Sequence, residues 1–331
     1  MSASLPASRG LDAEAPRLVF CGRIGELPDA TLGALVYGCD AHLAGAAAAD
    51  PRLVAVPLQA LPGSQCIEAW VTRGPVTGGR LAGLHFRASA DHLFGHLEVD
   101  EAGAGGLRAA ARDAYRQLLH FHAHCDHRHL WRIWNFVDGI NDGDGDEERY
   151  RQFCLGRAEG IGSDLEGYPA GTAVGTRTGL RRLQLIWLAG RVPGHPVENP
   201  RQLSAFRYPR QYGPASPSFS RAMRLGDQLL ISGTSSIIGH ETVHGGDLAA
   251  QLRESLGNLQ SVARAAGMGA ARLSGLKAYV RRTPDLAPVA AQLGHSGLPQ
   301  GVACVLEADI CRSDLLLELE AVALSGVVPA S

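Results

Sequence analysis

The sequence predicts an α+β protein of two lobes, each built from a mixed β-sheet with helices on one face. At 331 residues the chain is longer than one hydrophobic core usually serves, which favours two lobes. Short apolar runs typical of strands fill much of the first half, whereas the C-terminal part alternates strands with helices. We expect residues 1–15 to be disordered, 16–165 to form the first lobe, 166–200 to connect, and 201–331 to form the second lobe.

The first lobe is expected to consist of strands covered by at least one helix. A helical stretch at 106–124 leads into a strand at 129–137. The other expected strands are residues 17–25, 53–61, 66–74, 81–89 and 92–100.

The middle of the chain is expected to be irregular. Residues 139–179 are rich in glycine and aspartate, apart from a short helix at 146–160, and a strand at 182–190 follows. The segment YPRQYGPASPSFSRA at 208–222 has neither a helical period nor strand alternation, and its three prolines indicate a loop of fixed shape. Irregular segments held on rigid elements are frequent places for binding sites.

The second lobe has the clearest pattern. Residues 247–267 are predicted to form an amphipathic helix that ends at Gly267. Its apolar stripe consists of Leu248, Leu252, Leu256, Leu259 and Ala263. The other expected elements are a strand and Gly/Ser turn at 227–240, a strand at 274–282, a helix at 286–294, and strands at 301–311 and 314–324.

Composition and charge exclude several classes of partner. The formal net charge is -2 and charged residues make up 19% of the chain, so there is no electrostatic reason to expect nucleic acid or an acidic membrane. No apolar run in the sequence is long enough to span a membrane. The seven cysteines lack CxxC spacing, and the N-terminal residues lack the apolar core of a signal peptide. We therefore expect a cytoplasmic protein with reduced thiols.

The final predicted strand carries two carboxylates where hydrocarbon is expected. In residues 314–324 one face holds only leucine and alanine, and the other holds Glu318 and Glu320 among apolar residues. An isolated buried carboxylate usually raises its pKa until it is neutral, and a neutral carboxylic acid can donate a proton. The pattern also fits a glutamate that leans out at the strand end or pairs with an arginine. Periodicity does not choose between the two glutamates.

The second lobe resembles the reactive-intermediate deaminase (Rid/YjgF) family in the order of its segments. The matching segments are SPSFSRAMRLGDQLLISGTSSIIG, QLRESLGNL, AAGMG, LKAYV and LELEAVAL. In that family the first glutamate of the closing Glu-x-Glu, Glu318 here, projects into a cleft. The arginine that clamps the substrate carboxylate, fifteen residues earlier, corresponds to Ala303. This argues against an imine deaminase of the usual kind.

Longer segments resemble the chorismatase family. They are LWRIWNFVDGIN, ERYRQFCLGR, NPRQLSAFRYPRQYGPASPSFSRA, SGTSSIIGH and DICRSDLLLELE, in this order, and the resemblance covers about residues 129–325. It implies two lobes related to the Rid/YjgF (chorismate mutase-like) fold. It also implies that the substrate is chorismate and that pyruvate is released without a metal or an organic cofactor.

The chorismatase resemblance also implies a set of site residues. Glu318 is expected to protonate the methylene carbon of the enolpyruvyl ether. Relatives that make 3-hydroxybenzoate carry a cysteine where Cys311 stands, so this thiol is expected to act on the ring, as a nucleophile or by helping the ring to lose water. The two carboxylates of chorismate require cationic forks and hydroxyl donors on stiff backbone. The expected substrate-binding residues are Arg149, Arg157, Tyr208, Arg210, Tyr212, Ser235 and Ser236.

Several alternatives stay open. The favoured ring product is 3-hydroxybenzoate, with or without 4-hydroxybenzoate, whereas a chorismate hydrolase would give 3,4-dihydroxycyclohexa-1,5-dienoate. The other classes are a deaminase-like enzyme acting on imines or another small acid, and a noncatalytic protein that binds a metabolite or a metal. The related deaminases are trimers, but a two-lobed chain could also be a monomer.

Other motifs carry less weight. The stretch HFHAHCDHRH at 120–129 is the best metal candidate, but it lies at the end of a predicted helix without a matched acidic partner, and we expect no metal site. The calcium-loop pattern of DGDGDEERY fails because Glu147 stands where glycine is required and Phe153 where glutamate is required. GTAVGTRTG lacks the ending of a phosphate loop, and no G-x-S-x-G motif occurs.

Overall fold

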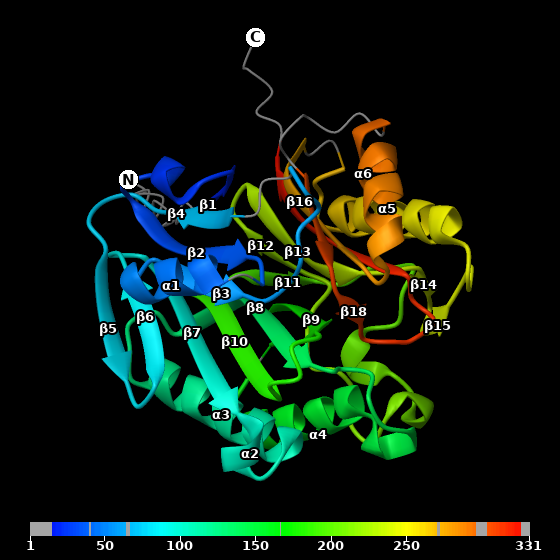
Figure 1. Ribbon diagram of the computed structural model, residues 1–331, viewed down its shortest axis with the longest axis horizontal. Coiled ribbons are helices and arrows are strands. Elements are labelled where there is room, and N and C mark those ends of the chain that lie inside the picture. Colours follow the sequence, from blue (N-terminus) through cyan, green and yellow to red (C-terminus); the bar gives the residue numbers. More distant parts are fainter. Residues whose placement is uncertain are drawn as a thin grey trace, which may run out of the picture.

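Three main β-sheets meet around a shared hydrophobic core, and helices cover their outer faces (Figure 1). This arrangement is seen in a computed structural model that describes residues 15–39, 41–63, 67–165, 167–269, 272–295 and 303–325. It confirms the predicted α+β class. All but the last residue of the predicted disordered N-terminus lies outside the described residues.

The first sheet has four strands in the order β1-β4-β2-β3. Its elements are β1 (Arg17–Cys21), β2 (Thr31–Tyr37), α1 (Ala41–Ala49), β3 (Leu53–Val56) and β4 (Ile67–Val71). Helix α1 connects the parallel strands β2 and β3 and packs on the outer face of the sheet. The sequence pattern does not predict α1, because a run of alanines gives no amphipathic stripe. The inner face contributes Leu35, Tyr37 and Trp70 to the shared core.

The second sheet has seven strands in the order β18-β9-β8-β10-β7-β6-β5. Its strands are β5 (Thr77–Leu81), β6 (Leu84–Ala88), β7 (His92–Asp100), β8 (His129–Asp138), β9 (Ala170–Thr176), β10 (Arg182–Gly190) and β18 (Asp309–Ile310). Helices α2 (Glu101–Ala104), α3 (Leu107–Ala123) and α4 (Arg149–Ile161) lie below this sheet in Figure 1. The predicted helices at 106–124 and 146–160 correspond to α3 and α4.

Helix α4 is held close to α3 by glycines. A methyl group at Gly156 would overlap the backbone oxygen of Arg108, and one at Gly160 would collide with Tyr115. The two helices therefore pack with their backbones near each other, and only glycine fits at these positions. This contact positions α4, which carries Tyr150, Arg151 and Arg157 of the site described below.

Residues 166–200 do not form a connecting segment. They contain β9 and β10, of which β10 pairs with β7 and β8, and β9 runs parallel to β8. Strand β9 is absent from the sequence prediction because AGTAVGT has few large apolar side chains. On its other edge β9 pairs with β18, so a piece of the C-terminal part completes the sheet of the N-terminal part. The two predicted lobes therefore share one sheet.

The third sheet has six strands in the order β11-β12-β13-β19-β16-β17. Its strands are β11 (His195–Val197), β12 (Ala222–Leu225), β13 (Gln228–Thr234), β16 (Arg272–Val280), β17 (Ala303–Glu307) and β19 (Leu317–Leu324). Helices α5 (Leu248–Ala265) and α6 (Leu286–His295) pack on its outer face. The remaining elements are the hairpin β14 (Ile237–Ile238) and β15 (Glu241–Thr242), and the 3-10 helices η1 (Ile24–Glu26), η2 (Gly145–Glu147), η3 (Ala205–Arg207), η4 (Arg210–Tyr212) and η5 (Thr283–Asp285).

Strand β19 confirms the predicted burial on both faces. It lies between β13 and β16, and its residues from Leu317 to Ala323 are all buried. Leu317, Leu319, Ala321 and Ala323 belong to the cluster that α5 and α6 cover. Because side chains alternate along a strand, Glu318 and Glu320 point to the opposite side, toward the centre of the molecule.

Candidate active site

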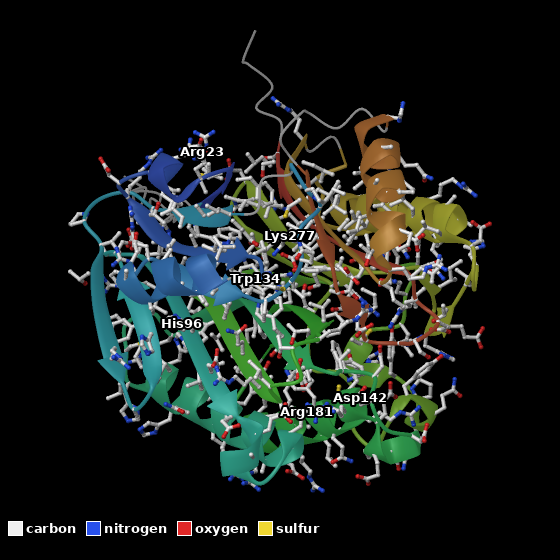
Figure 2. All side chains as sticks on the ribbon, viewed as in Figure 1. Arg23, His96, Trp134, Asp142, Arg181 and Lys277 are labelled. Atoms are coloured by element: carbon white, nitrogen blue, oxygen red, sulfur yellow. The ribbon has the colours of Figure 1, made fainter. Side chains whose placement is uncertain are left out.

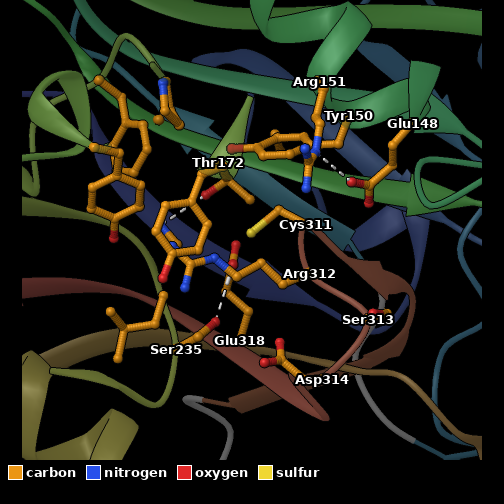
Figure 3. A pocket seen from close by; sticks show the side chains of 18 of the residues that line it. Glu148, Tyr150, Arg151, Thr172, Ser235, Cys311, Arg312, Ser313, Asp314 and Glu318 are labelled. Atoms are coloured by element: carbon orange, nitrogen blue, oxygen red, sulfur yellow. Dashed lines mark hydrogen bonds and ion pairs between the residues drawn. The ribbon is translucent and has the colours of Figure 1, made fainter. Parts of the chain in front are cut away.

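A cavity of about 450 Å³ lies where α4, β9, the 208–221 loop and the segment preceding β19 meet. Its wall combines parts of both predicted lobes, which the shared second sheet brings together. Figure 3 shows the side chains of Glu318, Cys311 and Thr172 in this cavity. Six of the nine predicted site residues line it: Glu318, Cys311, Arg157, Tyr208, Tyr212 and Ser235.

Glu318 reaches the cavity from the interior of the third sheet. Only 5% of the residue is exposed, and Ser235 Oγ donates a hydrogen bond to its Oε2 at 3.2 Å. Burial raises the pKa of Glu318 to about 7, and the carboxylate of Glu320 also raises it. A carboxylic acid that still carries its proton is thus available near neutral pH.

Gly233 makes the space for this carboxyl group. A methyl group at Gly233 would overlap Oε1 of Glu318. The Gly233 N–H donates to Thr172 Oγ1 at 3.1 Å, which ties the end of β13 to β9. The glycine in SGTSS therefore serves the packing of the acid rather than a turn.

Glu320 points to the same side of β19 as Glu318, but its surroundings favour the ionised form. Arg132 Nη2 lies 2.6 Å from its Oε2, and Lys277 Nζ lies 2.7 Å from its Oε1. Trp134 Nε1 donates to Oε1 at 2.8 Å. Burial by itself would raise the pKa of Glu320, but the two cations lower it to about 2. The two glutamates therefore differ in charge at neutral pH, a division of roles that is common among catalytic acids.

Cys311 faces the cavity as a thiol. Burial, together with the charge of the nearby Glu318, raises the pKa of Cys311 to about 12. Burial likewise raises the pKa of the Tyr150 phenol well above its usual value. Both groups keep their protons at neutral pH, so this environment disfavours Cys311 as a thiolate nucleophile and leaves it as a neutral donor beside Glu318.

Three arginines in the cavity wall have guanidinium nitrogens without a partner among the described residues. In each of Arg157, Arg221 and Arg312 one nitrogen donates to a backbone oxygen, at 2.6, 2.8 and 2.8 Å. The acceptors are Ser218, Leu203 and His240. Nε of Arg157, Nε of Arg221 and Nη2 of Arg312 are buried and unpaired within the described parts of the chain. Buried donors that lack an acceptor indicate a place for an anion.

The tyrosines of the 208–221 loop hold two of these arginines in place. The Arg312 guanidinium lies 3.9 Å from the centre of the Tyr212 ring and 5.1 Å from that of Tyr208. Arg221 Nη2 donates to Tyr208 Oη at 2.9 Å. Stacked guanidinium groups lose little freedom when they bind a carboxylate, because their orientation is already fixed.

The structure places three of the expected substrate-binding residues, Arg149, Arg210 and Ser236, outside the lining of this cavity. Arg149 Nη2 binds Glu101 at 2.6 Å, and its guanidinium fastens the start of α4 to the end of β8. Arg210 is 66% exposed and pairs with Asp146 on the surface. Ser236 Oγ is fully buried and donates to the backbone of the β15 side of the hairpin.

Sequence reasoning missed the neighbours that take these places. Arg151 lies two residues after Arg149 and lines the cavity, since a helix turns adjacent positions to different sides. Arg221 and Arg312 stand inside the quoted segments SFSRA and DICRSD but were not singled out. The sequence offers one indication for Arg312, which directly follows the predicted site residue Cys311. It offers none for Arg221.

Comparison with known proteins finds relatives over most of the chain. Residues 68–189 match the family model described as chorismatase FkbO/Hyg5-like, N-terminal. A 3-hydroxybenzoate synthase from Streptomyces hygroscopicus is 36% identical over 277 residues, which cover 77% of this chain and 80% of that protein. The chain belongs to the chorismatase family. A chorismatase from Streptomyces rapamycinicus is 37% identical over 275 residues, covering 77% of this chain and 81% of its own length.

A solved chorismatase structure has the same fold. The crystal structure of a chorismatase superposes with a TM-score of 0.81 at 29% identity, covering 94% of this chain and 99% of that one. The predicted membership of the chorismatase family is thus confirmed. No helix in the described ranges is long and apolar enough to cross a membrane. Within the same ranges no group of three or more His, Cys, Asp or Glu side chains is arranged to hold a metal ion. The side chain of Ala303 lies outside the described residues.

Proposed function

We propose that this chorismatase converts chorismate into pyruvate and 3-hydroxybenzoate. The observation that carries the proposal is the cavity itself, which a buried Glu318 with a raised pKa lines together with arginines that have unpaired N–H groups. The relative named 3-hydroxybenzoate synthase supports the choice of product. A volume of about 450 Å³ is within the usual range for small-molecule sites.

The cavity suits a dianion with an acid-labile enol ether. The unpaired nitrogens of Arg157, Arg221 and Arg312 would receive the two carboxylates of chorismate. Phe219, Ile237 and the tyrosine rings offer apolar surface to the cyclohexadiene ring. Fixing both ends of the substrate leaves the enolpyruvyl methylene carbon to meet the carboxyl group of Glu318.

In the proposed first step Glu318 transfers its proton to the methylene carbon, and electrons from the ether oxygen form an oxocarbenium ion. The Glu318 carboxylate then lies beside this cation and stabilises it. The oxygen of the ring 4-hydroxyl group then captures the ion to form a cyclic ketal, and the hydroxyl proton passes to the Glu318 carboxylate. Protonation of carbon is the difficult step, and a positioned general acid typically accelerates such a step by about 10²–10⁴-fold.

The atom balance defines what must happen to the ring. Pyruvate and 3-hydroxybenzoate together contain all the atoms of chorismate, so one hydrogen moves from a ring carbon to the new methyl group. Glu318 protonates the ketal oxygen on ring C4 as the bond from this oxygen to the ring breaks, and the Glu318 carboxylate is the base that we assign to the proton on ring C3, which regenerates the acid. The resulting hemiketal collapses to 3-hydroxybenzoate, which keeps the C3 oxygen, and to pyruvate, which keeps the former C4 oxygen. If water instead captures the ion, the water oxygen leaves in pyruvate, the ring keeps both of its oxygens, and the product is 3,4-dihydroxycyclohexa-1,5-dienoate.

The rate is expected to fall above about pH 7. Free enzyme must carry the Glu318 proton to react, and that proton is lost as the pH rises through a pKa of about 7. We expect kcat/KM for chorismate to be constant at lower pH and to fall about tenfold per pH unit in the alkaline range. Initial rates of pyruvate release between pH 5 and 9 give the profile. A rate that instead increased through pH 7 would mean that Glu318 acts first as a base.

Cys311 is expected to decide the ring product. Its protonated thiol lies beside Glu318 and can donate to an oxygen of the ring while occupying space that water would fill. We expect Cys311→Ala to keep pyruvate release within about tenfold and to shift the ring product toward the dihydroxydienoate. Chromatography of the products measures the ratio. Cys154→Ala is the matched control, because Cys154 is buried behind Tyr150 and does not line the cavity. An unchanged yield of 3-hydroxybenzoate in Cys311→Ala would remove the thiol from the mechanism.

The test of the proposed function combines two measurements on the purified protein. Pyruvate formed from chorismate is followed by oxidation of NADH with lactate dehydrogenase, and the ring product is identified by its retention and absorption spectrum. Pyruvate with 3-hydroxybenzoate supports the proposal. Pyruvate with the dihydroxydienoate would make the chain a hydrolase, and the absence of pyruvate would overturn the proposal.

A further inference from the structure

Four charged side chains form a network in the interior, behind the wall of the cavity. They are Glu68 of β4, Lys277 of β16, Glu320 of β19 and Arg132 of β8. None of these residues is more than 5% exposed. Figure 2 places Lys277 in the interior between the sheets, beside Trp134. Lys277 is the only lysine of the whole sequence.

The network is balanced in charge. Lys277 Nζ lies 2.5 Å from Glu68 Oε2 and 2.7 Å from Glu320 Oε1, and Arg132 Nη2 lies 2.6 Å from Glu320 Oε2. Two cations thus meet two anions. Neutral donors complete the shells of the carboxylates: Tyr37 and Trp70 donate to Glu68, and Trp134 and Tyr279 donate to Glu320. A buried network of this kind is costly if it is incomplete.

One end of the network reaches the acid. Thr172 lines the cavity, and its Oγ1 accepts from Arg132 Nη2 at 2.5 Å and donates to Glu320 Oε2 at 2.8 Å. The same oxygen accepts from the N–H of Gly233, the residue against which the Glu318 carboxyl group packs. The charge on Arg132 and Glu320 is therefore separated from Glu318 by only a few buried atoms.

The charges around Glu318 fall into two groups. On the cavity side, Arg221, Arg312 and Arg157 keep nitrogens for an anion, and Cys311 and Tyr150 stay neutral. On the sheet side, the charge of Arg132 lowers the pKa of Glu318 and the charge of Glu320 raises it. The remaining neighbours across the strands, Tyr279 opposite Glu318 and Lys277 opposite Glu320, belong to the network or are neutral.

We propose that Glu320 is a positioning residue that keeps Glu318 protonated by neutralising Arg132, and that Lys277 and Glu68 hold Glu320 in place for this purpose. An unneutralised Arg132 would stabilise the ionised form of Glu318, so that fewer molecules carry the proton when substrate arrives. Glu320 itself does not contact the cavity. This inference rests on the proposed role of Glu318 as the acid.

The test measures how kcat/KM depends on pH in Glu320→Gln. The decisive part of this profile is the alkaline limb, the pH range over which kcat/KM falls as the pH rises. Loss of one negative charge beside Arg132 is expected to move the limb to lower pH by about one pH unit or more. For a shift of about one pH unit, the variant would lose about sevenfold more activity at pH 8, relative to the wild type, than at pH 5.5. A role in stability alone would lower activity at all pH values and leave the midpoint unchanged.

Two further variants separate charge from folding. Arg132→Met/Glu320→Gln removes one cation and one anion and leaves the Lys277 and Glu68 pair intact, so the limb is expected to return to the wild-type position. Glu68→Gln removes the same charge at the far end of the network, so its limb is expected to move less than that of Glu320→Gln. Equal shifts in the single and the double variant would overturn the proposal, and so would an unshifted Glu320→Gln. If Glu320→Gln does not fold, the other two variants decide the matter. An alkaline limb that is unchanged in Glu68→Gln but shifted in the double variant would then overturn the proposal.

Infrared spectroscopy can measure the protonation of Glu318 directly, so the shift in its midpoint can be tested without enzyme turnover. Infrared difference spectra of wild type against Glu318→Gln isolate the C=O stretch of the protonated acid, and its loss with rising pH gives the midpoint. The same subtraction in the Glu320→Gln background is expected to show a lower midpoint. If chorismate gave no pyruvate but this shift were present, the proposed function would fail while the network proposal stood.

Discussion

Glu318→Gln is expected to lower the rate of pyruvate release from chorismate by about 10²–10⁴-fold and to leave the fold intact. Glutamine has nearly the same shape and can accept the Ser235 hydrogen bond, but it has no proton to give to carbon. KM is expected to change little, since the unpaired nitrogens that would bind the carboxylates remain. Steady-state kinetics by the lactate dehydrogenase assay measures both constants. A variant with more than about a tenth of the wild-type rate would place the acid elsewhere.

Stability provides an internal control for this variant. The pKa of Glu318 in the folded protein is about 7 and its ordinary value is about 4.5, so folding favours the protonated form. That contribution is complete below the ordinary pKa and is lost as the pH rises through 7. The difference corresponds to about 3 kcal/mol at ~1.4 kcal/mol per pH unit. Glu318→Gln avoids the buried charge, so its Tm should exceed that of the wild type at pH 8, and the gap should shrink toward pH 5.

The alternation of apolar residues predicted the strand of Glu318 and its two buried faces, but it did not choose between the two glutamates. The choice depends on Arg132, Lys277 and Trp134, which come from distant strands and lie around Glu320. Such long-range pairing leaves no periodic trace in sequence. The family resemblance supplied the choice, and the structure supplies its electrostatic cause.

The arginines illustrate the same limit. Arginine makes up 30 of 31 basic residues, so its presence in a suspected loop says little about its role. Arg210 is itself a predicted site residue and Arg312 follows one, yet Arg210 pairs with Asp146 at the surface, whereas Arg312 stacks on Tyr212 inside the cavity. Which arginine is already neutralised can be known only when its acidic partners are placed.

Residues 166–200 show where local pattern fails for the fold. Strand β10 was predicted from its apolar run, but β9 was not, because small residues in β9 leave room for Phe219 and Ile140 to pack against the sheet. A methyl group at Gly171 or Gly175 would collide with these side chains. Gly171 also lines the cavity, together with Thr172 and Ala173. The small side chains that hide β9 from sequence prediction therefore form part of the cavity wall.

Arg312→Met is expected to raise KM for chorismate by about 10²-fold with much less effect on kcat. Removal of one partner from a buried charge pair costs ~2–5 kcal/mol, and about 1.4 kcal/mol corresponds to a factor of ten in affinity. A carboxylate that does not react is held equally in the ground state and in the transition state, so its loss affects binding rather than the chemical step. Arg312→Lys is expected to give an intermediate KM, because lysine keeps the charge but cannot reproduce the planar stack on Tyr212.

Arg210→Met is the matched control for this experiment. It removes the same type of side chain from the adjoining loop, but Arg210 is mostly exposed and forms a surface pair with Asp146, which contributes little. Its KM should stay within about twofold of the wild type. If Arg312→Met lowered kcat and left KM unchanged, Arg312 would act on charge that develops only during the reaction. The unpaired Nη2 would then be directed at negative charge that develops on Glu318 or on the oxygen that leaves the ring, rather than at a carboxylate of chorismate that does not react.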